Sequence, residues 1–571
     1  MSWSTATRRR RLERWRTKDM GLILVFGPPG TGKTEYDLRQ MEAWRNEGIS
    51  LDEIAYVSFM KTAVKDGAKR FGLTEQDNRW FRTLHSLCFR VLELTRDSVV
   101  DPKWMKEWAK KVGFQVADEE EGGDLEDFSE AVTHIMATLE KPDAQTEGSR
   151  IKSLYDLSRL LSRSVEDLDY VKKQPHPGTT DYQWPGFSAG VYTHFVALYE
   201  KGKAEDQKFD FTDMLAEVLR RRFIVLPKWK RAVIDEIQDM SPLQFAVIEK
   251  LWFGRCETIL FSGDDDQAIF SFQGANAHEF LKYRNYPDTQ VKILEQTHRF
   301  GPNGVRYAGL ITDRIKERQP KNVIGLAGRE NPIRNKLSFD PGEVMDGDLL
   351  LHRHVAGCSE IADRLVDEGV PFYNERRGSN PFKNASELNA YLAFRDLSEG
   401  KSITATGLQY LLKKVPSLTV DKRRLVFHGV KKKAEALKGN ETVSFGDLSS
   451  FFTEGFMKAI REKNRRDVDL NFGDYYDKLN QARYDFEKFP KTRIGTIHAS
   501  KGRQAKRVWL WAETFPKALA KAGDDEHRVA FVGATRMQHE LMIVRERLIG
   551  DWTREYRYPE TDNTVLVRTN E

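Results

Sequence analysis

Two short stretches, far apart in the sequence, carry residue types that together can bind a nucleoside triphosphate. They are GPPGTGKT at residues 27–34 and VIDEIQD at residues 233–239. In the first, glycines let backbone N–H groups curl around phosphate, and a lysine and a hydroxyl follow at the start of a helical run. In the second, two carboxylates stand at the end of an apolar run, where they can hold a metal ion and orient water.

Each residue of this pair of stretches has an expected role. Lys33 is expected to reach the β- and γ-phosphates, and the Thr34 hydroxyl is expected to bind Mg²⁺ together with Asp235. Glu236 is expected to orient and deprotonate the attacking water, although an acidic pair at a strand end can also be a simple helix cap. The residues expected to bind ATP through the loop are Gly27, Pro28, Pro29, Gly30, Thr31, Gly32, Lys33 and Thr34.

Three further polar side chains are candidates for the same site. Gln267 follows another strand end and is a candidate sensor of the γ-phosphate. Arg299 and Arg536 lie in or near a second predicted sheet, from which a cation can reach the γ-phosphate only when the two domains close. Either arginine, considered alone, would be interpreted as a surface residue that forms a salt bridge. The motif around each one favours the catalytic interpretation instead.

Seven short apolar runs have the pattern of strands buried on both faces of a parallel sheet. Each run ends in polar or charged residues, and ligands bind at the carboxyl ends of strands in such sheets. The sequence therefore predicts an α/β fold in which these ends carry the chemistry. The runs are residues 21–26, 231–236, 258–264, 291–296, 348–353, 493–499 and 506–513.

Two long stretches lack the strand pattern. Residues 90–205 and residues 376–488 are predicted to be mostly helical insertions into sheet-forming domains. The first contains an acidic segment, residues 117–127, which we interpret as a solvated loop rather than a metal site. The second contains a basic segment, residues 401–440, which either contacts duplex phosphates or forms a solvated helical face.

Composition narrows the class of protein. A chain of 571 residues has room for roughly three or four domains. The net charge of +5 restricts any nucleic-acid contact to local patches. The sequence holds 3 cysteines without a CxxC pair, and it shows neither a membrane-length apolar run nor a secretory signal pattern. These features predict a cytoplasmic protein in a reducing compartment, without membrane contact.

Further motifs accompany the two stretches in a fixed order. SFMKTA and TLHSLCFRVL precede VIDEIQDMSPLQ, and GDDDQAIFSFQGA, LEQTHRF, TIHASKG and DDEHRVAFVGATR follow it. This order resembles the superfamily-one DNA helicases of the UvrD/Rep/PcrA group, as a short member. The resemblance implies two RecA-like P-loop domains with parallel sheets, each carrying a mostly helical insertion. The expected division is a basic tail at 1–17, a first motor domain at 18–90 and 200–298 with its insertion at 91–199, and a second motor domain at 299–375 and 489–571 with a shortened basic insertion at 376–488.

The resemblance also implies a track for a nucleic-acid strand. Phe270 and Phe272 would point the same way from an extended segment and could stack on bases, or both could pack in the domain core. The family positions for adenine and ribose fall on His298 and Gln504, where the usual tyrosine and glutamate are replaced. The positions that match strand-lining residues of the family are Phe59, Thr83, His85, Phe270, Phe272, Thr496 and His498.

By this resemblance the chain is expected to be an ATP-dependent, Mg²⁺-requiring 3′–5′ DNA helicase or translocase. Its expected partners are single-stranded DNA and junctions between single-stranded and duplex DNA, and it is expected to be a monomer or weak dimer. Roles in DNA repair or replication fit the family. The alternative is an ATP-gated translocase, or a protein-clearing or recruitment factor, with little unwinding of its own.

Overall fold

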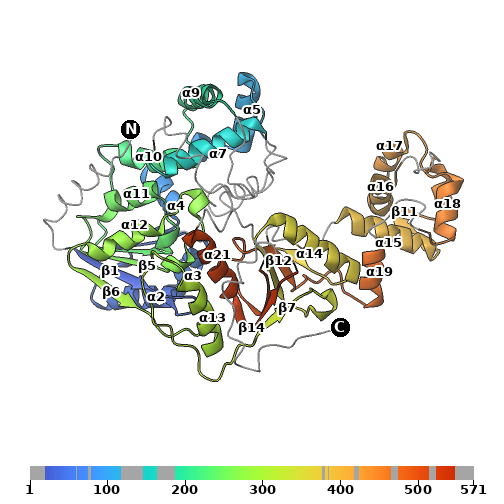
Figure 1. Cartoon of the computed structure of the whole chain (residues 1–571). Coiled ribbons are helices and arrows are strands. Elements are labelled where there is room, and N and C mark those ends of the chain that lie inside the picture. Colours follow the sequence, from blue (N-terminus) through green and yellow to red (C-terminus); the bar gives the residue numbers. More distant parts are fainter. Residues whose placement is uncertain are drawn as a thin grey trace. The chain divides into compact units, whose positions relative to one another are not determined.

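The computed structural model describes ten stretches of the chain, namely residues 20–59, 61–74, 79–116, 146–163, 187–375, 380–382, 385–416, 424–464, 473–512 and 523–546. The chain forms two compact units (Figure 1). The first unit consists of residues 1–338, 351–355 and 496–571, and the second of residues 339–350 and 356–495. The basic tail at 1–17 and the acidic segment at 117–127 lie outside the described residues, and the division into motor domains and insertions stays a prediction.

The first sheet has six parallel strands in the order β3-β2-β4-β5-β1-β6. Its apolar runs at 21–26, 231–236 and 258–264 are buried strands, as predicted. The run at 291–296 is not buried on both faces, since Val291 is 44% exposed. The reason is that this strand lies at the sheet edge and pairs only with β1. The strands are β1 Gly21–Phe26, β2 Ile54–Ser58, β3 Phe81–Arg82, β4 Arg231–Asp235, β5 Thr258–Gly263 and β6 Thr289–Ile293.

The second sheet also has six strands, in the order β7-β14-β13-β8-β12-β9. The predicted runs at 348–353, 493–499 and 506–513 correspond to three of these strands. Two α/β sheets of this kind confirm the predicted fold class. The strands are β7 Ile333–Lys336, β8 Leu349–His352, β9 Tyr373–Asn374, β12 Arg493–Thr496, β13 Ala505–Trp511 and β14 Met537–Val544.

Helices near the strand ends begin at side chains that cap them. Thr83, Asp210 and Ser241 each accept a hydrogen bond from a backbone N–H in the first helical turn, which satisfies donors that the helix itself leaves free. These caps fix where the polypeptide turns from strand or loop into helix beside the site. The helices of this region are α2 Lys33–Asn46, α3 Lys61–Arg70, α4 Leu84–Val91, α10 Phe211–Arg220, α11 Pro242–Trp252, α12 Ala277–Leu281, α13 Pro302–Thr312 and α21 Asp524–Ala534.

The described parts of residues 90–205 are helical, as predicted. The helices α5 Pro102–Val112, α7 Glu147–Leu160 and α9 Ala189–Glu205 enclose an aromatic core that includes Trp108 and Phe195. The rings of these two residues meet edge to face at 5.3 Å.

The described parts of residues 376–488 are also mostly helical, with a short antiparallel pair, β10 Ile403–Thr404 and β11 Thr442–Val443. The stretch buries a core of its own, in which Phe452 stacks on Phe456 at 3.9 Å. Figure 1 shows α15 Ser386–Ser398, α16 Ala405–Lys414, α17 Val430–Glu435 and α18 Glu454–Arg461 gathered around β11. The helix α19 Gly473–Gln481 contacts α15. Throughout the ten described stretches, every helix is too short or too polar to cross a membrane.

Candidate functional site

The loop between β1 and α2 has the backbone shape that a phosphate cradle requires. Gly30 and Gly32 both have φ of +79°, a left-handed conformation that glycine adopts without strain. A Cβ at Gly30 would lie 2.4 Å from the Cβ of Arg299, so only glycine fits here. Lys33 Nζ donates to the Gly27 carbonyl oxygen at 2.9 Å, which holds the amine over the loop.

The rest of the loop is tied to itself and to the segment that carries Arg299. Thr31 donates to the Pro28 carbonyl oxygen through both its hydroxyl, at 2.8 Å, and its backbone N–H, at 3.2 Å. Thr297 Oγ1 donates to the Pro29 carbonyl oxygen at 2.8 Å, and the His298 N–H donates to that of Gly30 at 2.9 Å. The loop is therefore held in shape from both sides.

Asp235 ends strand β4 directly beside the helix that begins after the loop. Thr34 Oγ1 donates to Asp235 Oδ2 at 3.2 Å, which brings the two expected Mg²⁺ ligands together. Tyr56 and Ser262 donate to the same carboxylate at 3.2 and 3.1 Å. Burial, and then the neighbouring Glu236 carboxylate, raise the pKa of Asp235 to about 6. Burial and the neighbouring charge thus disfavour the ionised form of Asp235. Its carboxylate and the Thr34 hydroxyl are hard oxygen ligands of the kind that suit Mg²⁺.

Glu236 lies at the start of a continuous path of hydrogen bonds. Its Oε2 accepts from Gln238 Nε2 at 2.5 Å, and Gln238 Oε1 accepts from the Asp264 N–H at 3.0 Å. Asp264 Oδ2 accepts from Gln267 Nε2 at 2.7 Å, and Gln267 Oε1 accepts from Arg536 Nη2 at 3.0 Å. The path joins the expected general base to one of the two expected arginines through the expected sensor.

The charges around Glu236 keep it ionised. Burial alone would raise its pKa, but Lys33, Lys501, the hydrogen bond from Gln238 and Arg536 together outweigh burial, and the pKa is lowered. A carboxylate that stays ionised at neutral pH is able to accept a proton from water.

Arg536 is buried, Arg299 is partly buried, and the two side chains lie near each other. Arg299 Nη1 donates to the Thr535 carbonyl oxygen at 3.0 Å, and Arg536 Nε donates to that of Val532 at 2.9 Å. Burial lowers the pKa of Arg299 to about 10. Burial, and then the charge of Arg299, lower the pKa of Arg536 to about 9. Both remain charged at neutral pH, so the site holds two cations that can face a triphosphate.

Two lysines that the sequence did not single out connect the motif segments. Lys501, in TIHASKG, donates to both carboxylate oxygens of Asp239 at 2.6 Å and to the Gln267 carbonyl oxygen at 2.7 Å. Lys321, whose side chain has no exposed surface, pairs with three aspartates at 3.1, 2.6 and 2.7 Å. Those aspartates, at positions 264, 265 and 266, would otherwise resemble a metal site. Nothing in the local sequence of Lys321 indicates this role, whereas the motif around Lys501 could have suggested one.

Four of the expected strand-lining residues form one ring cluster, which we call the aromatic cluster: Phe59, Phe270, Phe272 and His498. The Phe59 and Phe270 rings stack at 5.6 Å, and the Phe272 and His498 rings meet at 5.4 Å. Phe270 and Phe272 are only 7% and 6% exposed, so in this structure the two rings are covered.

The prediction of an extended segment for Phe270 and Phe272 is wrong. Residues Ser271–Gln273 form a 3₁₀ turn, which is followed by Gly274 with φ of +83°. The two phenylalanine rings still lie 6.0 Å apart, because the turn brings them to one side of the loop.

The other expected contact residues have separate surroundings. Thr83 caps α4, and His85 lies in that helix with its ring 6.1 Å from that of Phe211. Burial lowers the pKa of His85 to about 3, so the imidazole is neutral at pH 7. Thr496, at the end of β12, accepts from the Ala499 N–H at 3.2 Å. Their contacts with nucleic acid stay predictions, as do those of His298 and Gln504 with the nucleotide; the last two residues are exposed.

The fold and the site define a P-loop nucleotide-binding protein with two six-stranded sheets. Residues 12–288 match the family model described as the UvrD/REP helicase N-terminal domain. The ATP-dependent DNA helicase PcrA of Bacillus subtilis (strain 168) is 23% identical over 96% of this chain and 83% of its own length. The ATP-dependent DNA helicase UvrD1 of Mycobacterium tuberculosis (strain ATCC 25618 / H37Rv) is 23% identical over 92% of this chain and 67% of its own length. The family-model match and these relatives together support a helicase of the UvrD/Rep/PcrA family.

Proposed function

We propose that the protein is an ATP-dependent DNA helicase that moves along single-stranded DNA in the 3′–5′ direction and opens duplex at the junction. The observation that carries this proposal is the hydrogen-bond path from Glu236 through Gln267 to Arg536. It joins the residues of a triphosphate site to the loop that also bears Phe270 and Phe272. The direction of movement and the choice of DNA are supported by the family alone.

ATP and Mg²⁺ fit the residues that form the site. The N–H groups of the glycine loop and the Lys33 amine would hold the phosphates, and Thr34 with Asp235 would hold the metal ion. When bound, Mg²⁺ would neutralise charge on the phosphate oxygens. Glu236 accepts the proton of the attacking water, because Lys33 and Lys501 keep its carboxylate ionised. Arg299 and Arg536 stabilise the negative charge that develops on the transferred phosphoryl group.

The coupling between hydrolysis and movement runs through one short loop. Gln267 is bonded to Arg536 on one side, and its own carbonyl oxygen accepts from Lys501 on the other. Lys501 Nζ lies 4.9 Å from the centre of the Phe270 ring. A change in the position of Arg536 when the γ-phosphate leaves would therefore shift the loop that carries Phe270 and Phe272 of the aromatic cluster.

The aromatic cluster is the proposed contact for bases. Stacking of a base on an aromatic ring contributes about 1–3 kcal/mol and tolerates any sequence. Because Phe270 and Phe272 are covered in this structure, the proposal requires the rings to become accessible when a strand binds. Thr83, His85, Thr496 and His498 are proposed to line the same strand.

Movement along a single strand can be tested without any duplex. Oligonucleotides that carry biotin at either the 5′ or the 3′ end are loaded with streptavidin, and its release is followed with ATP and Mg²⁺. We expect faster release from the 5′ end, and no release by Lys33→Ala. Equal release from both ends would contradict directional movement. Rapid release in this assay, combined with no strand separation on a tailed duplex, would favour the alternative of a protein-clearing translocase.

A further inference from the structure

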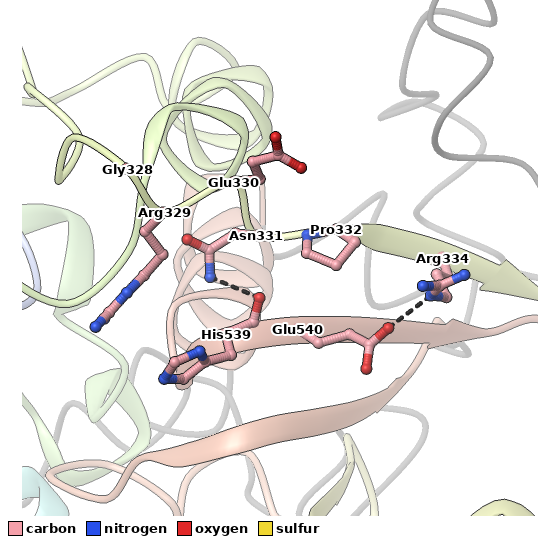
Figure 2. A pocket seen from close by; sticks show the side chains of 8 residues that line it. All are labelled: Gly328, Arg329, Glu330, Asn331, Pro332, Arg334, His539 and Glu540. Carbon is pink, nitrogen blue, oxygen red and sulfur yellow. Dashed lines mark hydrogen bonds and ion pairs between the residues drawn. The ribbon is translucent and has the colours of Figure 1, made fainter.

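A buried asparagine links the two segments that carry the proposed catalytic arginines. Asn331 is 1% exposed, and its φ of +55° is a left-handed conformation that asparagine tolerates better than most residues. Its Oδ1 accepts from the Gly301 N–H at 2.5 Å, just beyond Arg299 in the sequence. Its Nδ2 donates to the carbonyl oxygens of Gln538 and His539, at 2.9 and 2.8 Å, just beyond Arg536. Figure 2 shows the Asn331 amide pointing at the strand that bears His539.

A second side chain from the same turn makes a parallel connection. Arg329 Nη1 donates to the carbonyl oxygen of Arg299 itself at 2.6 Å and to that of Gln538 at 3.4 Å. Arg329 and Asn331 line the depression drawn in Figure 2, between the turn at Gly328 and strand β14. One turn of the chain thus holds the backbone beside both proposed catalytic arginines.

The backbone of this turn is closely packed against the segment that carries Arg299. The Leu326 N–H donates to the Phe300 carbonyl oxygen at 2.9 Å, and the Ile324 N–H to that of Glu295 at 2.8 Å. A Cβ at Gly301 would lie 1.5 Å from the Arg329 carbonyl oxygen, a distance that no side chain could accommodate. Residues 324–331 are therefore closely packed against the segment that carries Arg299.

The contacts of Asn331 and Arg329 join two segments whose arginine side chains repel each other. Arg299 and Arg536 are like charges in a buried site, and each has its pKa lowered, first by burial. Among the described residues, Arg299 Nε has no hydrogen-bond partner, and the Arg536 guanidinium donates to Val532, Gln267 and Thr535 rather than to a carboxylate. The Glu236 carboxylate attracts both charges, but their mutual repulsion favours separation, and backbone contacts that join the two segments oppose that repulsion.

We propose that Asn331, assisted by Arg329, is a positioning residue that fixes Arg299 and Arg536 relative to each other for ATP hydrolysis. This inference rests on the proposed function, in which both arginines face the γ-phosphate. The Asn331 amide bonds to backbone groups, namely the Gly301 N–H and the carbonyl oxygens of Gln538 and His539. It acts by setting the distance between two groups that must reach one phosphate together, and a displacement of about 1 Å in such an arrangement can lower a rate about 100-fold.

The test uses Asn331→Asp in the full chain. Aspartate tolerates the same backbone conformation and still accepts from Gly301, but its second oxygen would face two carbonyl oxygens. We expect kcat for ATP in the presence of single-stranded DNA to fall about 10- to 100-fold. The affinity for a fluorescent ATP analogue should change less than about threefold, since Lys33 and Thr34 are untouched. The matched control is Asn285→Asp, which makes the same change at an exposed position and should keep wild-type kcat.

A double variant distinguishes positioning from general damage. Single-turnover hydrolysis is measured for Asn331→Asp, for Arg536→Ala and for both together. If Asn331 acts through the arginines, its substitution has little further effect once Arg536 is absent. An equal loss in both backgrounds would overturn the inference. Should Asn331→Asp fail to fold by circular dichroism, Arg329→Met removes the second connection, and an unchanged kcat in that variant would overturn it as well.

The outcomes also separate this inference from the proposed function. If Arg299→Ala and Arg536→Ala both keep wild-type kcat, the catalytic role of the arginines is wrong, and the inference falls with it. If both lose turnover while Asn331→Asp and Arg329→Met keep it, only the positioning role is wrong.

Discussion

Replacement of Gln267 by alanine interrupts the path between Glu236 and Arg536 at its middle. The amide of Gln267 donates to the Asp264 carboxylate at 2.7 Å and accepts from the Arg536 guanidinium at 3.0 Å. Both partners are charged and buried, and a hydrogen bond to a charged group contributes about 1.5–3 kcal/mol. If the bond to Arg536 is needed in the transition state, its loss lowers kcat about 10- to 150-fold, at about 1.36 kcal/mol for each factor of ten.

The assay is steady-state ATP hydrolysis with saturating single-stranded DNA, over a range of ATP concentrations. We expect the loss in kcat, with a KM for ATP within about threefold of wild type, because Lys33 and Thr34 keep their contacts. Gln290→Ala, at an exposed position of the edge strand β6, is the matched control and should match wild type. Wild-type kcat in Gln267→Ala would refute the reasoning, because the path would then carry no catalytic coupling.

Three further predictions concern the base, the aromatic cluster and a buried histidine. Glu236→Gln should lower single-turnover hydrolysis about 100- to 10,000-fold while ATP binding, measured with a fluorescent analogue, persists; a smaller loss would assign the proton to another group. Phe272→Ala should lower strand displacement more than it lowers hydrolysis without DNA, and wild-type displacement would contradict base stacking by this ring. His85 has its pKa lowered by burial to about 3, below the unfolded value of about 6.5, so it contributes stability above pH 6.5 that is lost as pH falls toward 3. Between pH 7 and pH 5 that loss is about 2 kcal/mol, and the Tm of wild type should therefore fall more than that of His85→Gln; parallel pH profiles would contradict it.

The sequence was sufficient wherever local pattern determines structure. Apolar runs with polar ends predicted β1, β4 and β5, because central strands of a parallel sheet are apolar on both faces. The sequence of the glycine loop predicted its conformation, since glycine is the residue type that adopts the left-handed φ seen at Gly30 and Gly32.

A strand of mixed polarity lacks the continuous apolar run on which these predictions depended, and it was therefore missed. Strand β14, MQHELMIV, has polar residues after a buried Met537 and is continuously buried only from Leu541 onward, so its pattern does not stand out from the motif before it. Strand β6 was predicted, but its exposure was not, because a position at the sheet edge is a property of topology.

The parts of the site that were not predicted depend on contacts between distant segments. Lys321 pairs with aspartates of another segment, and Gln238 bridges the acidic strand end and the next strand. Asn331 joins residues on two sides of the arginine pair. A single sequence shows none of these pairings, because each requires the fold to bring its partners together. The 3₁₀ turn at Phe272 was also missed, since neither propensity nor spacing separates it from an extended segment.

The most direct test of an ATP-driven DNA motor is strand displacement on two duplexes that share one sequence and differ only in a 3′ or a 5′ single-stranded tail. The reaction contains ATP and Mg²⁺, and Lys33→Ala controls for contaminating helicases. We expect wild type to separate the 3′-tailed duplex and to leave the 5′-tailed duplex intact. Separation of only the 5′-tailed duplex would contradict the proposed direction, and separation of neither, alongside ATP hydrolysis stimulated by single-stranded DNA, would contradict duplex opening by this chain alone.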